Sequence, residues 1–84
     1  MKNNNDLKKK ILYRSTHRGS KEMDLLLGTF AKKNINLFDE LDLKDFYNLL
    51  KKEDHIIYDW YFNKGVNKLI DANKLTILLK KFKL

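Results

Sequence analysis

The amino-acid sequence predicts an all-α protein, a small single-domain bundle of five short helices. Its 84 residues are enough for one domain. Apolar residues recur at the three- and four-residue spacing of a helix face almost throughout, and no segment shows convincing strand alternation. Hydrophobic residues make up 43% of the chain, which is ample for a compact core. We expect residues 1–6 to form a short flexible N-terminus and residues 7–84 to form the domain.

The first two predicted helices are separated by a polar connection. Asp6 is the expected N-cap of a helix that runs through Arg14 or slightly beyond. Its inward-facing residues are Leu7, Ile11 and Leu12. Gly19 interrupts the pattern, and the second helix ends near Asn34, which tolerates a left-handed conformation. The apolar stripe of the second helix consists of Met23, Leu26, Leu27 and Phe30.

The third predicted helix begins at Asp42, which is the expected N-cap. Leu41 and Phe46 have the spacing of a hydrophobic staple around that cap. The predicted buried face consists of Leu43, Phe46, Tyr47 and Leu50.

The last two predicted helices are also short. Asp54 is the expected N-cap of a fourth helix that ends at Gly65. A second staple at Ile70, Asp71 and Leu75 predicts a last helix over roughly 71–83. The predicted core of the whole bundle consists of Leu26, Leu27, Phe30, Phe46, Leu50, Trp60, Leu78 and Phe82.

The net charge of +7 is unevenly distributed. Residues 1–21 contain seven basic residues and one acid, and residues 64–84 contain six basic residues and one acid. The middle, residues 22–63, contains five basic residues and nine acids. Two basic ends around an acidic middle would attract nucleic acid or an acidic protein surface, although lysines also simply keep small domains soluble.

The sequence lacks the residue patterns of most catalytic sites. It has no Cys, and its three glycines are too far apart to form a phosphate-binding loop. His17 and His55 are the only histidines and have no metal-ligand spacing. We therefore expect neither catalysis nor a metal site in this chain.

Features of a membrane or exported protein are also lacking. The longest apolar runs have three residues, whereas a membrane span needs about 20. The first residues, which include Lys2 and Asp6, lack the apolar core of a secretory signal. These observations predict a cytoplasmic protein without membrane insertion.

Residues 14–24 form the most unusual segment of the sequence. Gly19 as an N-cap, with Glu22 three residues later, would explain those two residues locally. Capping does not explain the concentration of basic side chains beside them, namely Arg14, His17, Arg18 and Lys21. Gly19 leaves the backbone bare for another chain, and the Arg18 guanidinium suits a carboxylate or phosphate. The segment is therefore a candidate interaction site.

Two blocks of the chain resemble the SdhE family of FAD assembly factors. Arg18, Gly19 and Glu22 reproduce the R-G-x-x-E signature of that family, and acid and leucine residues follow it. Residues 53–61, which end in Trp60-Tyr61, resemble the family's acidic and aromatic block. The resemblance extends over roughly residues 7–83.

The resemblance implies a five-helix protein that is not an enzyme. Such factors bind the flavoprotein subunit of succinate dehydrogenase or fumarate reductase and promote covalent attachment of its FAD. By this resemblance Arg18, Gly19 and Glu22 lie at the interface, and Lys21 and Asp24 match positions beside it. The chain itself is expected to bind no FAD tightly and to be a monomer when free.

Two other functions remain as alternatives. A small nucleic-acid-binding protein would explain the charge, the basic ends and the helix–turn–helix-like connections. Lysines outnumber arginines by sixteen to two, however, and no helix has a clear basic recognition face, which makes a nucleic-acid partner the weaker prediction. An antitoxin-type regulator is supported by little beyond the size of the chain.

Overall fold

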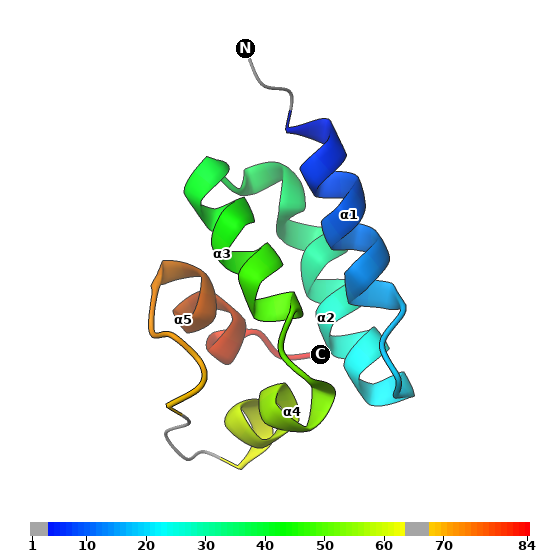
Figure 1. Cartoon of the computed structure of the whole chain (residues 1–84), viewed down its shortest axis with the longest axis vertical. Coiled ribbons are helices and arrows are strands. Elements are labelled where there is room, and N and C mark those ends of the chain that lie inside the picture. Colours follow the sequence, from blue (N-terminus) through cyan, green and yellow to red (C-terminus); the bar gives the residue numbers. More distant parts are fainter. Residues whose placement is uncertain (1–3, 64–67) are drawn as a thin grey trace.

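The computed structural model describes residues 4–63 and 68–84, and these form five α-helices and one short 3₁₀ turn (Figure 1). The described residues contain no strand, which confirms the predicted all-α class. In chain order the elements are α1 (Asn5–Thr16), α2 (Lys21–Asn34), η1 (Ile35–Leu37), α3 (Glu40–Leu50), α4 (Asp54–Phe62) and α5 (Lys74–Lys81).

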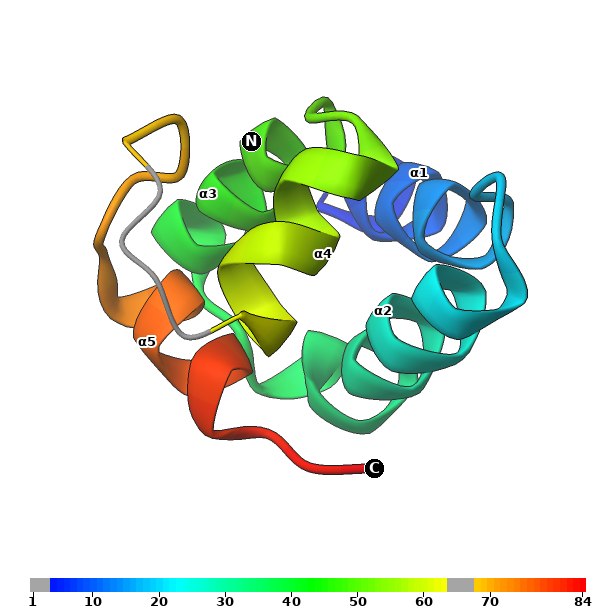
Figure 2. The same cartoon turned by 90° about the horizontal axis from the view of Figure 1, so that it is seen from below.

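Three helices form the body of the bundle, and two shorter ones close it. α1 packs along both α2 and α3, and α5 packs on α3. Figure 2 shows α4 crossing one end of the bundle, beside α5. This arrangement places the start of α4 next to the connection between α1 and α2.

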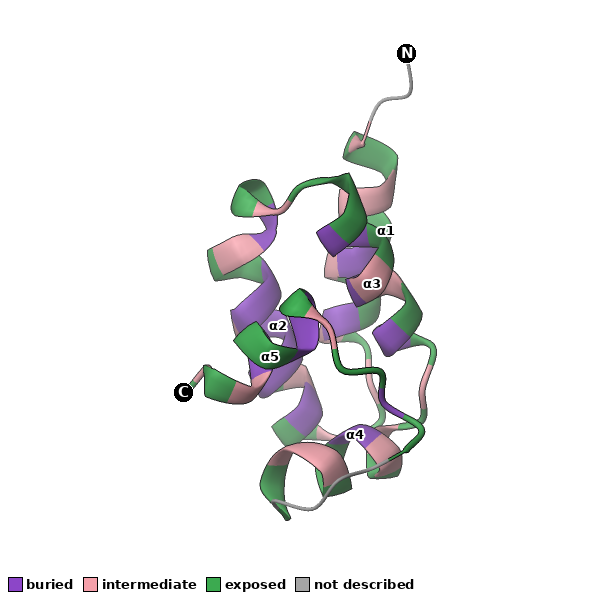
Figure 3. Cartoon of the chain, turned by 90° about the vertical axis from the view of Figure 1, so that its left-hand side faces the viewer, coloured by how far each residue is buried: buried purple, intermediate pink, exposed green. Residues whose placement is uncertain are grey.

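The core is made by the inward faces of all five helices, which are coloured as buried in Figure 3. Five of the eight predicted core residues are buried, namely Leu26, Leu27, Phe30, Phe46 and Leu50. Ile11 is also fully buried, which confirms the predicted inward face of the first helix. The periodicity of single helices thus identified most of the core.

Three of the predicted core residues have a different environment. Leu78 is 40% exposed, so its prediction as a core residue was wrong. The inward face of α5 carries Leu75 and Leu79, which are one turn apart. Trp60 and Phe82 are only partly buried against the core. Phe82 follows the end of α5, and its ring packs edge-on against Phe30 at a centroid distance of 5.4 Å.

The ends of α1 and α2 differ from the prediction. The N-cap position of α1 is Asn4, and Asp6 lies in the first helical turn. Ser20, not Gly19, caps α2, because its hydroxyl accepts a hydrogen bond from the Met23 amide and glycine has no such group. Asn34 is right-handed, with φ −119°, and the chain continues directly into η1.

The third helix begins earlier than predicted because Asp39 and Asp42 act together. Asp39 is the N-cap and accepts from the Asp42 amide, while the Asp42 carboxylate accepts from the Asp39 amide. Asp42 therefore closes a capping box from inside the helix. The predicted staple is also wrong, since Leu41 is 66% exposed. Phe38, before the true cap, packs on the rings of Phe30 and Phe46.

The last two helices also begin at other residues than predicted. Asp54 is the first residue of α4 and does not cap it, since Glu53 holds the N-cap position. α4 ends at Phe62, and the predicted stop at Gly65 lies outside the described residues. Asn73 caps α5 in a capping box with Thr76, so the predicted start at Asp71 was wrong.

The capping box of α3 predicts a specific pH dependence of stability. The hydrogen bond from the Asp42 amide lowers the pKa of the Asp39 carboxyl below its ordinary value of 3.8; desolvation opposes this shift and Lys74 reinforces it. A lowered pKa in the folded state stabilises the fold above the unfolded value and loses that effect as the pH falls. Asp39→Asn keeps a capping oxygen but cannot titrate. The melting temperatures of parent and variant should converge between about pH 6 and about pH 3; a constant difference would contradict this assignment.

Candidate functional site

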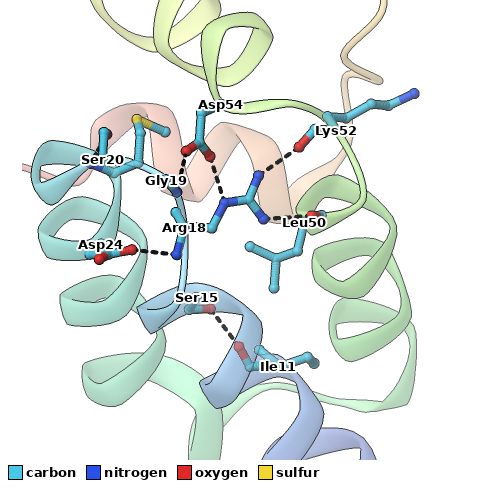
Figure 4. A network of polar contacts seen from close by, with 10 residues as sticks. Ile11, Ser15, Arg18, Gly19, Ser20, Asp24, Leu50, Lys52 and Asp54 are labelled. Atoms are coloured by element: carbon cyan, nitrogen blue, oxygen red, sulfur yellow. Dashed lines mark hydrogen bonds and ion pairs between the residues drawn. The ribbon is translucent and has the colours of Figure 1, made fainter.

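The polar segment 14–24 comprises the end of α1, the connection to α2 and the first turn of α2. Figure 4 shows that this connection lies against the start of α4 and the residues just before it. Residues distant in the sequence meet here, since Arg18 contacts Asp54 across 36 positions. The segment joins the first two helices to the fourth.

The side chain of Arg18 binds three groups of its own chain (Figure 4). Its Nε donates to Asp54 Oδ1 at 2.6 Å, and its two terminal nitrogens donate to the Leu50 and Lys52 carbonyl oxygens, each at 2.6 Å. The side chain is 9% exposed. The guanidinium predicted to be free for another molecule is thus engaged inside the domain, where it satisfies carbonyls at and just after the end of α3.

The backbone of the connection is held by two carboxylates. The Arg18 amide donates to Asp24 Oδ1 at 2.5 Å, and the Gly19 amide donates to Asp54 Oδ2 at 2.9 Å. Asp24, predicted as an interface residue, therefore orders the connection from the first turn of α2. Asp54 binds Arg18 and Gly19 at once, so its carboxylate ties the connection to the first residue of α4.

Gly28 within α2 and Gly19 in the connection before α2 have different surroundings. At Gly28, which is buried between α1 and α2, a Cβ would lie 3.0 Å from Thr16 Cγ2, so packing favours the absence of a side chain. At Gly19, which is exposed, a Cβ would lie 3.6 Å from Asp54 Oδ2, an ordinary contact. The backbone at Gly19 is also not left-handed. The fold of this chain therefore does not require glycine at position 19.

Glu22 is exposed in the first turn of α2 and has no hydrogen-bond or ion-pair partner among residues 4–63 and 68–84. The predicted capping bond from Glu22 to Gly19 is absent, because Ser20 is the cap and Met23 takes the N3 position. Lys21 is exposed as the first residue of α2. Both side chains are available to another molecule.

A groove of about 880 Å³ lies along the C-terminal half of α1. We call it the basic groove; it is lined by Lys9, Lys10, Tyr13, Arg14, His17, Arg18, Gly19, Tyr47 and Asp54. Tyr13 and His17 stack at a centroid distance of 3.9 Å, with their ring planes 16° apart. The Arg14 guanidinium lies over the Tyr47 ring at 5.4 Å. The groove thus combines aromatic faces with several cations.

A smaller hollow of about 440 Å³ adjoins the basic groove at Asp54. We call it the acidic hollow; it is lined by Ser20, Glu22, Met23, Asp54, His55, Tyr58, Asp59 and Asn63. Asp59 accepts a hydrogen bond of 2.6 Å from the Asn63 side chain. Three carboxylates and no lysine or arginine are among these lining residues, so this hollow suits a cation or a hydrogen-bond donor.

Two properties of the described residues bear on the kind of site. Residues 4–63 and 68–84 contain no group of three or more His, Asp and Glu residues placed to hold a metal ion. No helix among them has the length and apolar character needed to cross a membrane.

Comparison with protein families decides the relationship. Residues 9–83 match the model of the Sdh5 family, whose description is flavinator of succinate dehydrogenase. The chain belongs to this family. The resemblance predicted from Arg18, Gly19 and Glu22 and from the block 53–61 is therefore confirmed.

Individual relatives of the Sdh5 family agree with the match. The chain is 47% identical over 59 residues to the mitochondrial succinate dehydrogenase assembly factor 2 of Dictyostelium discoideum, which is 70% of this chain and 42% of that protein. It is 42% identical over 72 residues to the protein of that name in Scheffersomyces stipitis, covering 84% and 48%. It is 32% identical over 57 residues to the FAD assembly factor SdhE of Acetobacter pasteurianus, covering 68% and 52%. The chain thus spans about half the length of these relatives, and no solved structure matches it.

In this Sdh5-family chain the predicted site residues separate into two groups. Those that line the basic groove or the acidic hollow are Arg14, His17, Arg18, Gly19 and Glu22. Lys21 and Asp24 line neither. Sequence reasoning missed Lys10 and Tyr13, although each is one helical turn before a predicted residue, Arg14 and His17 respectively. Tyr47 and Asp54 come from other helices, and no local spacing indicates them.

Proposed function

We propose that this chain is an assembly factor that binds the flavoprotein subunit of succinate dehydrogenase or fumarate reductase and promotes its covalent FAD attachment. Membership of a family of flavinators supports this function. Relatives named succinate dehydrogenase assembly factor and FAD assembly factor support it as well. The chain acts without catalysing the linkage: it binds one conformation of the subunit preferentially and so raises the population that is competent for attachment.

The environment of Gly19 is the observation that carries this proposal. The fold tolerates a side chain there, yet the position has none and is exposed. It also borders the basic groove and is followed by Ser20 of the acidic hollow. A partner backbone that approaches position 19 closely explains the missing side chain.

The remaining site residues take different parts in this proposal. Glu22, Lys21, Arg14 and His17 are exposed and contact the subunit directly. Arg18 and Asp24 hold the connection that presents them, through bonds to the Leu50 carbonyl and the Arg18 amide. The R-G-x-x-E signature thus combines one structural residue, one bare backbone position and one exposed carboxylate.

Complementation tests the function directly. The chain would be produced in cells that lack their own assembly factor and contain the succinate dehydrogenase flavoprotein subunit. Covalent flavin would be measured as fluorescence of that subunit after denaturing electrophoresis, and binding by co-purification. We expect both covalent flavin and co-purification with the chain, and neither with an empty vector. A subunit that remains without covalent flavin and does not co-purify would contradict the proposal.

The isolated chain should not hold FAD tightly. It lacks a dinucleotide-binding fingerprint, and the described helices form no Rossmann unit. We expect no saturable change in flavin fluorescence when micromolar FAD is titrated with the purified chain. Stoichiometric binding at submicromolar concentration would show that the cofactor is bound by this chain and not only by its partner.

The other sequence-based predictions belong to the same proposal. A nucleic-acid partner is disfavoured because the acidic hollow adjoins the basic groove and would repel a polyanion. The cytoplasmic location and the monomeric free state remain predictions, which cell fractionation and light scattering after gel filtration can test.

A further inference from the structure

Two hollows of opposite charge adjoin on this molecule. Asp54 lines both of them, and the neighbouring residues Gly19 and Ser20 belong to one hollow each. A partner that lies across this junction therefore meets both charges at once. The order of the charges along that partner is then constrained.

The basic groove contains cations without internal partners. Lys9 and Lys10 are exposed, and neither forms a hydrogen bond or ion pair within residues 4–63 and 68–84. Elsewhere Lys44 pairs with Glu40 and Lys74 with Asp42, so the lysines of this protein are not uniformly free. Lys9 and Lys10 are available for carboxylates of another chain.

The acidic hollow shows the opposite pattern. Glu22 is exposed and lacks an ion-pair partner in the described part of the chain. Asp59 accepts a neutral amide hydrogen from Asn63 and forms no salt bridge within the described residues, and the Lys80 ammonium is near enough to interact with it electrostatically. Asp54 lies between the two hollows. Because it is already paired with Arg18, it adds little net charge to either of them. Glu22 and Asp59 are the carboxylates available to a partner cation.

We propose that the partner surface is bipolar: acidic side chains occupy the basic groove and a basic side chain occupies the acidic hollow. The partner backbone crosses at Gly19 between them. This inference rests on the proposed function and specifies the chemistry that the flavoprotein subunit must present. Opposite charges at the two ends admit one orientation of the partner and disfavour the reversed one, in which like charges meet.

The occupant is a polypeptide and not a polyanion. A nucleic acid or another run of phosphates long enough to fill the groove and cross Asp54 would face Glu22 and Asp59. A polypeptide can place both signs of charge within a few residues. The stacked Tyr13 and His17 rings also offer an apolar face to its side chains.

Neutralising each hollow separately tests the proposal. The purified full chain would be titrated with the purified flavoprotein subunit at low and high salt. The first variant is Lys9→Gln/Lys10→Gln, and the second is Glu22→Gln/Asp59→Asn, in which the amide oxygen introduced at position 59 keeps an acceptor for Asn63. The matched control is Lys32→Gln/Lys81→Gln, because both lysines are exposed and lie outside the two hollows. Circular dichroism and melting would verify that every variant folds.

We expect both site variants to weaken binding about three- to tenfold at low salt, and less at high salt, while the control stays within about twofold of the parent. The acidic variant is decisive. A partner that is merely anionic would bind it more tightly than the parent, because neutralising Glu22 and Asp59 removes repulsion. Tighter or unchanged binding of either site variant overturns the bipolar surface.

Failure of the bipolar surface can be distinguished from failure of the proposed function. A parent chain that does not bind the subunit would overturn both proposals. Loss of binding by Gly19→Arg together with unchanged binding by the two charge variants would leave the function standing and overturn only the bipolar surface.

Discussion

Gly19→Arg should lower covalent flavin on the flavoprotein subunit by more than about tenfold in the complementation assay, while the melting temperature stays near that of the parent. The fold accepts a side chain here, because a Cβ would make an ordinary contact with Asp54 and the backbone is not left-handed. The hydrogen bond that the backbone amide of residue 19 donates to the Asp54 carboxylate is retained. A long side chain at this exposed position would, however, hold a partner backbone away from the surface.

Asn36→Arg is the matched control for this prediction. Asn36 is exposed in η1 and outside both hollows, so the change adds the same charge and side chain elsewhere. The control should support flavinylation like the parent. If Gly19→Arg does so equally well, position 19 is not at the interface; if it is unfolded, the glycine has a structural role that its surroundings do not indicate.

Arg18→Ala should destabilise the domain by about 2–4 kcal/mol. The change removes the ion pair with Asp54 and leaves the Leu50 and Lys52 carbonyls without their donor. Small domains are stabilised by about 5–15 kcal/mol in total, so the loss is large. Urea unfolding of the purified chain measures it. Sequence reasoning places Arg18 at an interface, and on that basis Arg18→Glu would be expected to leave melting nearly unchanged.

Arg18→Lys and the double variant Arg18→Ala/Asp54→Ala distinguish the structural role from a simple change of charge. Lysine keeps the charge near Asp54, but its single nitrogen cannot replace three separate donors, so it should restore only part of the stability. In the double variant the two losses should be less than additive, because the residues contact each other. Additive losses, or an Arg18→Ala variant as stable as the parent, would refute the structural assignment.

The two predictions assign different roles to the residues of the R-G-x-x-E signature. Changes at Gly19 and Glu22 should impair partner binding in a folded protein, since neither side-chain position is used internally. Changes at Arg18 should act through loss of the fold. Measurements of activity alone would not separate these cases, because both would lower flavinylation.

Sequence reasoning succeeded where the physical cause is local. The Met23–Phe30 stripe, the inward face with Ile11 and the all-α class follow from the 3.6-residue period of a helix. Cap positions were less accurate. Asp39 and Asp42 are both suitable N-caps for α3, and Asp71 and Asn73 are both suitable for α5. Only the observed hydrogen bonds show that Asp39 and Asn73 are the actual caps.

The sequence by itself determined the helical class, most of the core and the family signature, because these depend on residues a few positions apart. The tertiary structure alone decided that Arg18 binds Asp54 and the Leu50 carbonyl, that Tyr47 lines the basic groove, and that Glu22 is exposed without a partner among the described residues. The physical reason is distance along the chain. Arg18 and Asp54 are 36 residues apart, and only the fold, which places the start of α4 against the connection between α1 and α2, brings the guanidinium and the carboxylate together (Figure 4).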